Sequence, residues 1–265
     1  MSTAARTATP LARRILASPS MVYIYVVLAI LTIWVVLSSL GSVPPVLLPT
    51  LGETLQQLAA IVSDPETLFA NVGATAAEVT LAFAFAAVAG VALGVVVGSR
   101  TDYSRAYEPL LANLNAIPIV LLYPLLLGAM GSGGEAKVVI GAISAGLPIA
   151  IATHWVVRGV DRDLVVAARS MGARRLSTVR SVTLPAVLPG VFSGLRTGLS
   201  LAIVTVVAGE FLSATVGLGL QLARAGESFQ TAALFAWLIV TAVFTAVMIG
   251  LLSVIQTLVI RKVNA

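Results

Sequence analysis

The chain has 265 residues, of which 58% are hydrophobic and 10% are charged, and its formal net charge is +5. A soluble globular domain carries about 25% charged residues, so this composition excludes a soluble protein and indicates an integral membrane protein. The absence of cysteine excludes disulfides and thiol chemistry. The apolar runs are longer than the strands of a membrane β-barrel and lack their alternation, so we predict an all-α polytopic membrane protein.

A polar tail over residues 1–20 carries three arginines and precedes the first apolar run. That run, from Met21 to Leu40, has the length of a span and lacks a small-residue cleavage site, so we interpret it as a retained helix and not as a signal peptide. Residues 21–265 are expected to form one transmembrane domain. Apolar runs of span length predict six transmembrane helices, at about 22–41, 73–98, 107–130, 138–157, 191–214 and 232–260.

The connections between these spans differ in charge. Thirteen of the sixteen Lys and Arg residues lie in the tail, in 99–108, in the loop 158–190 or at the end of the chain. The positive-inside bias therefore predicts that these segments, and both termini, are cytoplasmic. The same distribution makes the basic charge a topology signal, so no nucleic-acid partner is expected. On the opposite side, the connection 42–72 has three acidic residues, and Thr50 or Gly52 can cap a short amphipathic interfacial helix over 53–62.

The loop 158–190 is the most basic segment, and its centre reads VAARSMGARRLSTVRSVTLP. We predict two short helices broken at Gly172, which allows a backbone turn that a side chain would obstruct. Each helix has apolar residues on one side, which leaves the arginines for water or an acidic partner. Leu184-Pro185 is expected to stop the second helix and return the chain to the bilayer. A rigid helical hairpin of this kind suits the transmission of movement from a soluble partner.

The spacing in this loop is specific. Ala167-Ala168 is followed by three residues, Gly172, nine residues, Val182, one residue and Leu184-Pro185. This pattern resembles the EAA loop of the membrane subunits of binding-protein-dependent ABC importers, the loop that receives the ATPase. The resemblance implies a type I importer fold of six transmembrane helices with a cytoplasmic helical coupling loop. It places the ATPase-coupling residues at Val166, Ala167, Ala168, Arg169, Met171, Gly172, Ala173, Arg174, Arg175, Leu184 and Pro185.

One departure concerns Val166, where the family usually has an acidic residue, so docking must rely more on shape and on the neighbouring arginines. Further segments, among them LLPTLGETLQQLAAIV and VVAGEFLSATVGLGLQLARA, resemble the sulfonate, taurine and nitrate permease group over roughly 45–260. This resemblance implies a bacterial cytoplasmic (inner) membrane protein that pairs with a second copy of itself. Two ATPase subunits would bind ATP and Mg, and an extracytoplasmic solute-binding protein would deliver the cargo. No cofactor is expected on this chain.

The implied cargo is a small polar solute, an organic or inorganic anion of the sulfonate, taurine, nitrate or aromatic acid type. Two departures weaken the anion interpretation. Glu78 stands where the group usually has arginine, and Asn115-Ala116-Ile117-Pro118 replaces an Arg-Pro-Ile-Pro run. A pyrimidine vitamin precursor, or another neutral or cationic solute, therefore stays an alternative.

Ionisable and amide side chains inside spans are costly and usually face protein or water. On this ground the candidate substrate-pathway residues are Glu78, Asn113, Asn115, Tyr123 and Glu210. The carboxylates could instead be hydrogen-bonded struts, and the tyrosine could be a packing residue. Gly90, Gly94 and Gly98 form a small-residue face for helix packing, with a dimer seam as the alternative.

No catalytic constellation and no Walker A loop is present, so ATP hydrolysis is expected on another chain. One histidine without cysteine predicts no metal site. Three alternatives to a homodimeric permease stay open. These are one half of a heterodimeric permease, an ion-coupled secondary transporter, and a membrane scaffold that uses ATPase docking for another purpose. The secondary transporter would require an inverted repeat, which we do not find.

Overall fold

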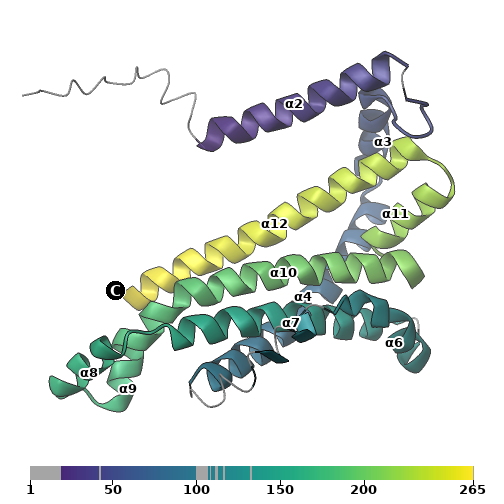
Figure 1. Cartoon of the computed structure of the whole chain (residues 1–265). Helices are drawn as coiled ribbons and strands as arrows, with labels where there is room; N and C mark the ends of the chain where they lie inside the picture. The colour runs from purple at the N-terminus through teal and green to yellow at the C-terminus, as the bar shows by residue number, and fades with distance from the viewer. Residues whose placement is uncertain are drawn as a thin grey trace, which may run out of the picture.

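The computed structural model describes residues 19–41, 43–99, 107, 109–110, 113–115, 117–131 and 133–264. Within these ranges the chain is helical and contains no strand, which confirms the all-α prediction (Figure 1). Residues 1–18 of the predicted tail lie outside them. The helices are α2 (Pro19–Ser39), α3 (Leu51–Ser63), α4 (Pro65–Gly98), 3₁₀ helix η1 (Ile119–Leu122), α6 (Tyr123–Met130), α7 (Gly134–Arg158), α8 (Arg162–Ser170), α9 (Arg175–Thr178), π-helix η2 (Val179–Thr183), α10 (Leu184–Ser213), α11 (Leu218–Glu227) and α12 (Thr231–Asn264).

Four helical segments of the described chain are long and apolar enough to cross a membrane: Pro65–Gly98, Gly134–Arg158, Val179–Ser213 and Thr231–Val263. Two shorter apolar segments, Tyr25–Ser39 and Ile119–Met130, stand where the first and third spans are predicted. The chain is therefore a multi-pass membrane protein, while the count of six spans stays a prediction. The span predicted over 107–130 is not one continuous helix. Pro118 lacks an N–H group and restricts the residue before it, so the helical path is interrupted there.

Helix α7 packs tightly between α4 and α10 through small residues. A Cβ atom on Gly90 or Gly94 of α4 would lie 2.7 Å from the carbonyl oxygen of Gly146 or 2.5 Å from that of Ala150. Gly198 of α10 approaches α7 just as closely from the other side. In lipid, where no hydrophobic force pulls helices together, such close backbone approach is what holds them. The glycine face of α4 is thus a packing surface within the chain, as predicted.

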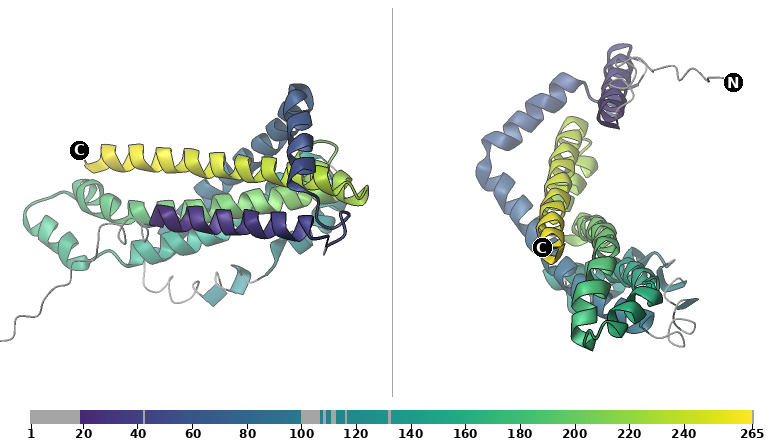
Figure 2. Two further views of the ribbon diagram at one scale, coloured as in Figure 1. Left: turned by 90° about the horizontal axis from the view of Figure 1, so that it is seen from above. Right: turned by 90° about the vertical axis from the view of Figure 1, so that its left-hand side faces the viewer.

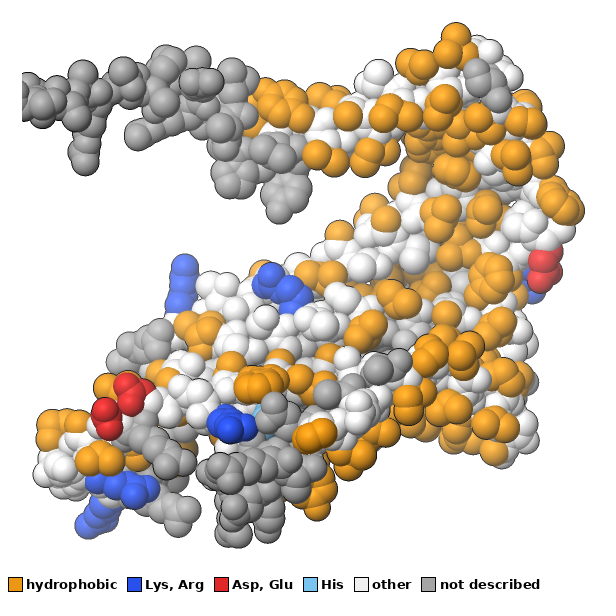
Figure 3. Space-filling model, viewed as in Figure 1, with side chains coloured by type: hydrophobic (Ala, Val, Ile, Leu, Met, Phe, Trp, Pro, Cys, Tyr) orange, Lys and Arg blue, Asp and Glu red, His pale blue; other side chains and the backbone are white. Residues whose placement is uncertain are grey.

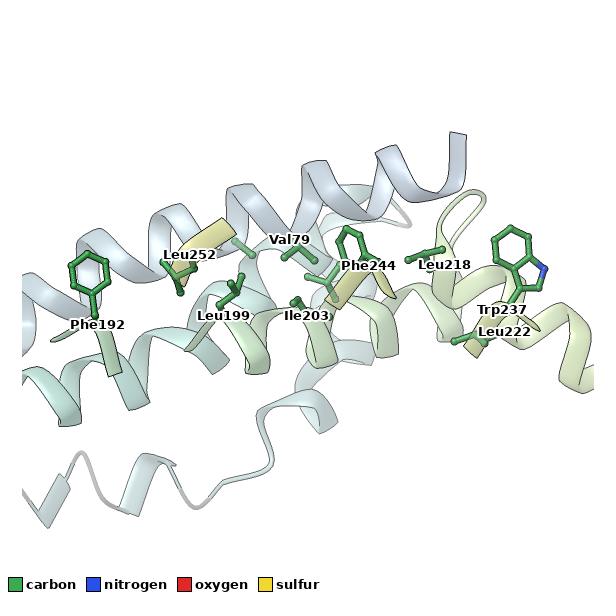
Figure 4. Close-up of a cluster of buried hydrophobic side chains, with 11 residues drawn as sticks. Val79, Phe192, Leu199, Ile203, Leu218, Leu222, Trp237, Phe244 and Leu252 are labelled. Carbon is green, nitrogen blue, oxygen red and sulfur yellow. The ribbon is translucent and has the colours of Figure 1, made fainter. Parts of the chain in front are cut away.

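The largest core cluster joins α4, α10, α11 and α12, as Figure 4 shows for the stretch around Leu199 and Phe244. Its buried members are Val79, Ala82, Phe192, Leu199, Ile203, Val206, Leu218, Leu222, Trp237, Phe244 and Leu252. Outside the core, large hydrophobic side chains are exposed along the helices, and on the face drawn in Figure 3 they dominate the surface. A surface of this kind is stable only against lipid or another protein.

The amphipathic helix predicted over 53–62 is α3, which begins two residues earlier. Thr50 caps it: the Glu53 N–H donates to the Thr50 hydroxyl over 3.2 Å, and the Thr50 N–H donates to the Glu53 carboxylate over 2.9 Å. This reciprocal capping box fixes the start of the helix. Seen from above, α3 lies across the direction of α12 (Figure 2). Helix α2 contacts α12 through the Trp34–Phe235 ring pair, with centroids 5.2 Å apart.

The two ends of the helix bundle carry different features. The α8–α9 hairpin and the C-terminal end of α12 lie at one end, called here the hairpin end (Figure 1). The turn from α11 into α12, and α6, lie at the opposite end, called here the α11 end. The lysines and arginines visible in Figure 3 gather mainly towards the hairpin end. The cytoplasmic location of α8–α9 rests on this charge distribution and stays a prediction.

Candidate functional site

The predicted coupling loop is a helical hairpin closed at Gly172. The Gly172 N–H donates to the Arg169 carbonyl over 2.9 Å, and the Ala173 N–H donates to the Ala168 carbonyl over 3.1 Å. This pair of bonds is a Schellman motif, in which the residue after the cap adopts a left-handed conformation. Gly172 does so, with φ +85°, but a Cβ atom there would meet nothing within 4 Å. The backbone angle itself, and not a contact with another element, therefore makes a side chain unfavourable at this turn, as predicted.

The hairpin presents apolar side chains to solvent. Met171 at its tip is 83% exposed, and Leu164, Val166 and Val179 are also exposed, whereas Ala168 is buried. The apolar side predicted for each helix is therefore only partly buried. An exposed apolar patch rimmed by polar residues marks an interaction site. The remaining predicted coupling residues Ala167, Arg169, Arg174 and Leu184 are exposed, Ala173 and Pro185 are half-buried, and the Arg175 side chain lies outside the described residues.

The second arm of the hairpin continues into the next span without a stop. Helix α9 passes through the π-helical turn Val179–Thr183 directly into α10, with Pro185 in the first turn of α10 and Pro189 inside it. The predicted break at Leu184-Pro185 is wrong, because the π-helical turn before Pro185 adjusts the backbone hydrogen bonding and lets the helix continue past the missing N–H. The second arm of the hairpin and α10 consequently form one helical rod.

At the α11 end, Glu210 lies in a closed polar network. Its side chain has no exposed surface. The Thr75 hydroxyl donates to Glu210 Oε1 over 2.7 Å, and the Gly219 N–H donates to Oε2 over 2.8 Å. The Leu218 N–H donates to the Thr75 hydroxyl oxygen over 2.9 Å. In the described conformation this side chain joins three helices through hydrogen bonds, and it lines none of the three cavities found among the described residues.

Asn71 extends the same network. The Gly217 N–H donates to Asn71 Oδ1 over 2.9 Å, and the Asn71 amide donates to the Thr67 carbonyl over 2.7 Å. Three consecutive N–H groups at the start of α11 are therefore satisfied by side chains of α4 and α10. These N–H groups have no partner within their own helix. We call Asn71, Thr75 and Glu210 the α11 clamp.

Glu78 pairs with Lys137 across α4 and α7. The Lys137 ammonium lies 2.6 Å from Glu78 Oε1, and both side chains are buried, at 4% and 14% side-chain exposure respectively. A buried ion pair compensates its desolvation only through close geometry, and loss of either partner leaves an isolated buried charge. Tyr123 lies near this pair: it is buried and its hydroxyl bonds to the Ser213 hydroxyl over 2.7 Å.

A groove of about 280 Å³ lies between α7, α10 and the interrupted segment around Pro118. Its polar lining comes from Asn115, Ser144 and Thr205, and the remainder is apolar. Asn113, two residues before Asn115, is exposed but does not line the groove. Of the five predicted pathway residues, Asn115 therefore lines this groove, while Glu78, Tyr123 and Glu210 are buried among helices.

Sequence reasoning missed Asn71, Thr75 and Lys137. A signal was present, because Asn71, Thr75 and Glu78 recur at intervals of four and three residues along an otherwise apolar helix. This spacing puts all three on one helical face. Their partners could not be identified, because the contacts with Lys137 and Glu210 join residues that are far apart in the sequence.

Comparison with known proteins assigns the chain to a family. The family described as "Binding-protein-dependent transport system inner membrane component" matches residues 86–265. The chain belongs to this family. The matched range contains the groove-lining residues, the hairpin, Glu210 and Lys137, but it excludes Glu78. The resemblance of the hairpin to the importer coupling loop agrees with this membership.

Relatives of this permease carry names of several transport systems. The chain is 37% identical over 157 residues to the riboflavin transport system permease protein RibX of Chloroflexus aurantiacus, which covers 59% of each protein. It is 29% identical over 219 residues to the taurine transport system permease protein TauC of Escherichia coli, which covers 81% of this chain and 79% of the relative. It is also 32% identical over 152 residues to the nitrate import permease protein NrtB of Leptolyngbya laminosa, covering 57% of this chain and 54% of the relative.

Proposed function

We propose that this permease forms the translocation pathway of an ATP-driven importer for a small polar solute. Two copies would form one pathway, two separate ATPase subunits would bind ATP and Mg, and a solute-binding protein would deliver cargo. The observation that carries the proposal is the exposed α8–α9 hairpin in a chain of this permease family. The chain is then a pathway subunit without catalytic activity of its own, with both termini on the cytoplasmic side.

The hairpin surface supports ATPase docking. Leu164, Val166 and Met171 offer an exposed apolar anchor, and Arg169 and Arg174 stand beside it for acidic partner residues. Interfaces commonly combine an apolar centre with a polar rim. The absence of an acidic residue at position 166 fits a docking mode led by shape. The helical connection from α9 into α10 would carry a movement of the hairpin into the membrane.

The groove beside Pro118 is the proposed segment of the solute pathway. Asn115, Ser144 and Thr205 can exchange hydrogen bonds with a passing polar solute, and the apolar remainder would hold it weakly. The relatives named for taurine, sulfonates and nitrate favour an anion. Amide and hydroxyl donors can accommodate an anion without binding it tightly, which a pathway requires.

A neutral heterocyclic solute is the second candidate. Its support is that the groove lining contains no charged side chain among the described residues. The relative named for riboflavin transport adds to this support. The binding protein would then make the selection, and the groove would tolerate either chemistry.

The test is gentle affinity purification of the tagged chain from its native membranes, with mass spectrometry of the proteins that co-purify. We expect an ATPase subunit in a ratio of one to one with this chain and no second permease. A second permease would show a heterodimer. Loss of the ATPase, under conditions in which a known importer keeps its own, would refute the proposal and turn attention to the Glu78–Lys137 pair as the charge site of an ion-coupled transporter. If the ATPase is recovered, the ligand bound by the binding protein encoded near it would identify the substrate.

A further inference from the structure

The turn between α11 and α12 is a second Schellman motif, with phenylalanine at the position usually held by glycine. The Phe229 N–H donates to the Gly226 carbonyl over 3.1 Å, and the Gln230 N–H donates to the Ala225 carbonyl over 2.9 Å. Phe229 has φ +54°, the single left-handed residue other than glycine in the described chain. The hydrogen-bond pattern is the one that closes the hairpin at Gly172, so the chain itself provides the comparison.

A phenylalanine in this conformation is unfavourable, because its Cβ atom approaches the neighbouring carbonyl oxygen. Burial does not compensate the strain, since the Phe229 side chain is 77% exposed. Backbone strain that persists without an evident packing gain is a reason to look for a function of the side chain. An aromatic ring held by a rigid turn loses little conformational entropy when it binds a partner, which favours such residues as interface anchors.

The Phe229 ring stands on the border of a groove of about 390 Å³ at the α11 end. The groove is lined by Pro45, Val46, Pro49, Glu53, Gln57 and Phe229, together with the first residues of α12. Two hydrogen bonds fasten its walls. The Thr231 hydroxyl donates to the Val46 carbonyl over 2.6 Å, and the Trp34 indole N–H donates to the Pro49 carbonyl over 2.9 Å. The groove is therefore built before any partner arrives.

The negative charge around this groove favours a partner with basic side chains. Segments 42–72 and 215–231 together hold four acidic residues and one arginine. Glu53 lines the groove, and hydrogen bonds from the Thr50 backbone and side chain hold its pKa below the ordinary value, so it is ionised at neutral pH. Exposed Glu227 lies two residues before Phe229. An occupant should therefore combine an apolar pocket for the ring with basic side chains for the rim.

We infer that the groove at Phe229 is the docking site for a lobe of the solute-binding protein. The Phe229 ring would enter an apolar pocket of that lobe, and basic side chains of the lobe would pair with Glu53 and Glu227. This inference rests on the proposed function, since it assigns that partner's contact surface. The groove lies at the end of the bundle away from the ATPase hairpin, so the two partners bind without overlap. Phe229 is an anchor of recognition and takes no part in solute passage.

The test uses the assembled importer in lipid nanodiscs and the purified binding protein encoded beside this chain. Phe229→Gly removes the ring and also relieves the backbone strain, so the variant keeps the turn. Phe229→Asn removes the ring in a residue that tolerates this conformation. We expect both variants to bind the binding protein about tenfold or more weakly, with reduced stimulation of ATP hydrolysis and unchanged basal hydrolysis. Phe69→Ala, at another exposed phenylalanine outside the groove, should change neither quantity.

Wild-type affinity in Phe229→Gly would overturn the inference while leaving the proposed function intact. A wild-type complex that neither binds nor responds to the binding protein would overturn both. A salt series adds a second criterion, because Glu53→Gln keeps the capping box but should weaken binding and flatten its salt dependence. Salt-independent binding would contradict the assigned charge complementarity.

Lipid and a second copy of the chain are the other possible occupants. Because the chain has no cysteine, Phe229→Cys gives a single site for a fluorescent label. A spectral change on addition of the binding protein supports the inference. Quenching by brominated lipids without the binding protein would assign the ring to the bilayer. Disulfide cross-linking between two copies of the unlabelled variant would assign it to a dimer contact. Either result would overturn the inference.

Discussion

Replacing Thr75 by valine tests the α11 clamp directly. Valine has nearly the same shape as threonine, so the substitution removes a hydroxyl without creating a cavity. It abolishes two hydrogen bonds, the 2.7 Å donation to Glu210 and the 2.9 Å bond received from the Leu218 N–H. It also leaves the N–H and one carboxyl oxygen buried without these partners. The first turn of α11 should then detach from α4.

The magnitude follows from these two losses. Polar contacts between membrane helices contribute about 0.6 kcal/mol each on average, which sets a lower value of about 1 kcal/mol for the pair. Unsatisfied buried partners cost about 1–3 kcal/mol each, which sets an upper value of about 6 kcal/mol. Because both groups left behind are fully buried here, we expect a loss of about 2–3 kcal/mol in the free energy of unfolding.

The assay is detergent-induced unfolding, followed by the fluorescence of buried Trp237. Thr153→Val is the matched control, because Thr153 is equally buried but its hydroxyl has no hydrogen-bond partner. That variant should be as stable as the wild type or more stable, since a buried unsatisfied hydroxyl is unfavourable. Thr75→Ser should retain most of the stability. Equal losses for the two valine variants would refute the reasoning, as would unchanged hydrogen-exchange protection of the Leu218 amide in Thr75→Val.

Three further predictions concern charge and backbone. Lys137→Met should lower the free energy of unfolding by about 3 kcal/mol, because it leaves the Glu78 carboxylate buried without its partner. The double variant Glu78→Gln with Lys137→Met should recover most of that stability in an unfolding titration, whereas additive losses would contradict the pairing. Gly172→Ala should reduce transport in reconstituted vesicles more than Gly172→Asn, because asparagine tolerates positive φ better; the reverse order would show that side-chain size decides. Hydrogen bonds from Thr50 lower the pKa of Glu53 below 4.5, so the cap stabilises α3 above that pH and should weaken as the pH falls through the lowered pKa of Glu53. The backbone amides of α3 should then exchange hydrogen faster, after correction for intrinsic exchange rates. The same pH response in Thr50→Ala would contradict this role of the cap.

Local signals explain what could be predicted from sequence. The capping box at Thr50 and the turn at Gly172 each depend on residues within five positions of one another. Because all the hydrogen-bonding partners of such a motif lie in one short segment, the segment alone predicts where a helix begins or ends. Long apolar runs predict membrane spans because their length and composition are also properties of one continuous segment.

Features that depend on partners distant in the chain could not be predicted. Glu210 was expected in the pathway because an ionisable group inside a span usually has a functional role. Its hydrogen bonds to Thr75 and Gly219 could be known only from the packing of α4, α10 and α11. The pairing of Glu78 with Lys137 likewise needs the contact between α4 and α7. Burial alone does not separate a strut from a binding residue; the identity of the partners does.

The correction at Leu184-Pro185 changes the mechanical argument. A stopped helix would isolate the coupling hairpin from the membrane, whereas the observed rod runs through η2 and α10 to Ser213 without interruption. Glu210 lies in the last turn of that rod and holds the first turn of α11. Helix α11 in turn ends at Glu227, and Phe229 closes the turn that follows it. We expect a displacement of the hairpin to reach the opposite end of the bundle through this rod and the buried Glu210 carboxyl group. The π-helical turn Val179–Thr183 is the place in the rod where the helical hydrogen bonding is least regular.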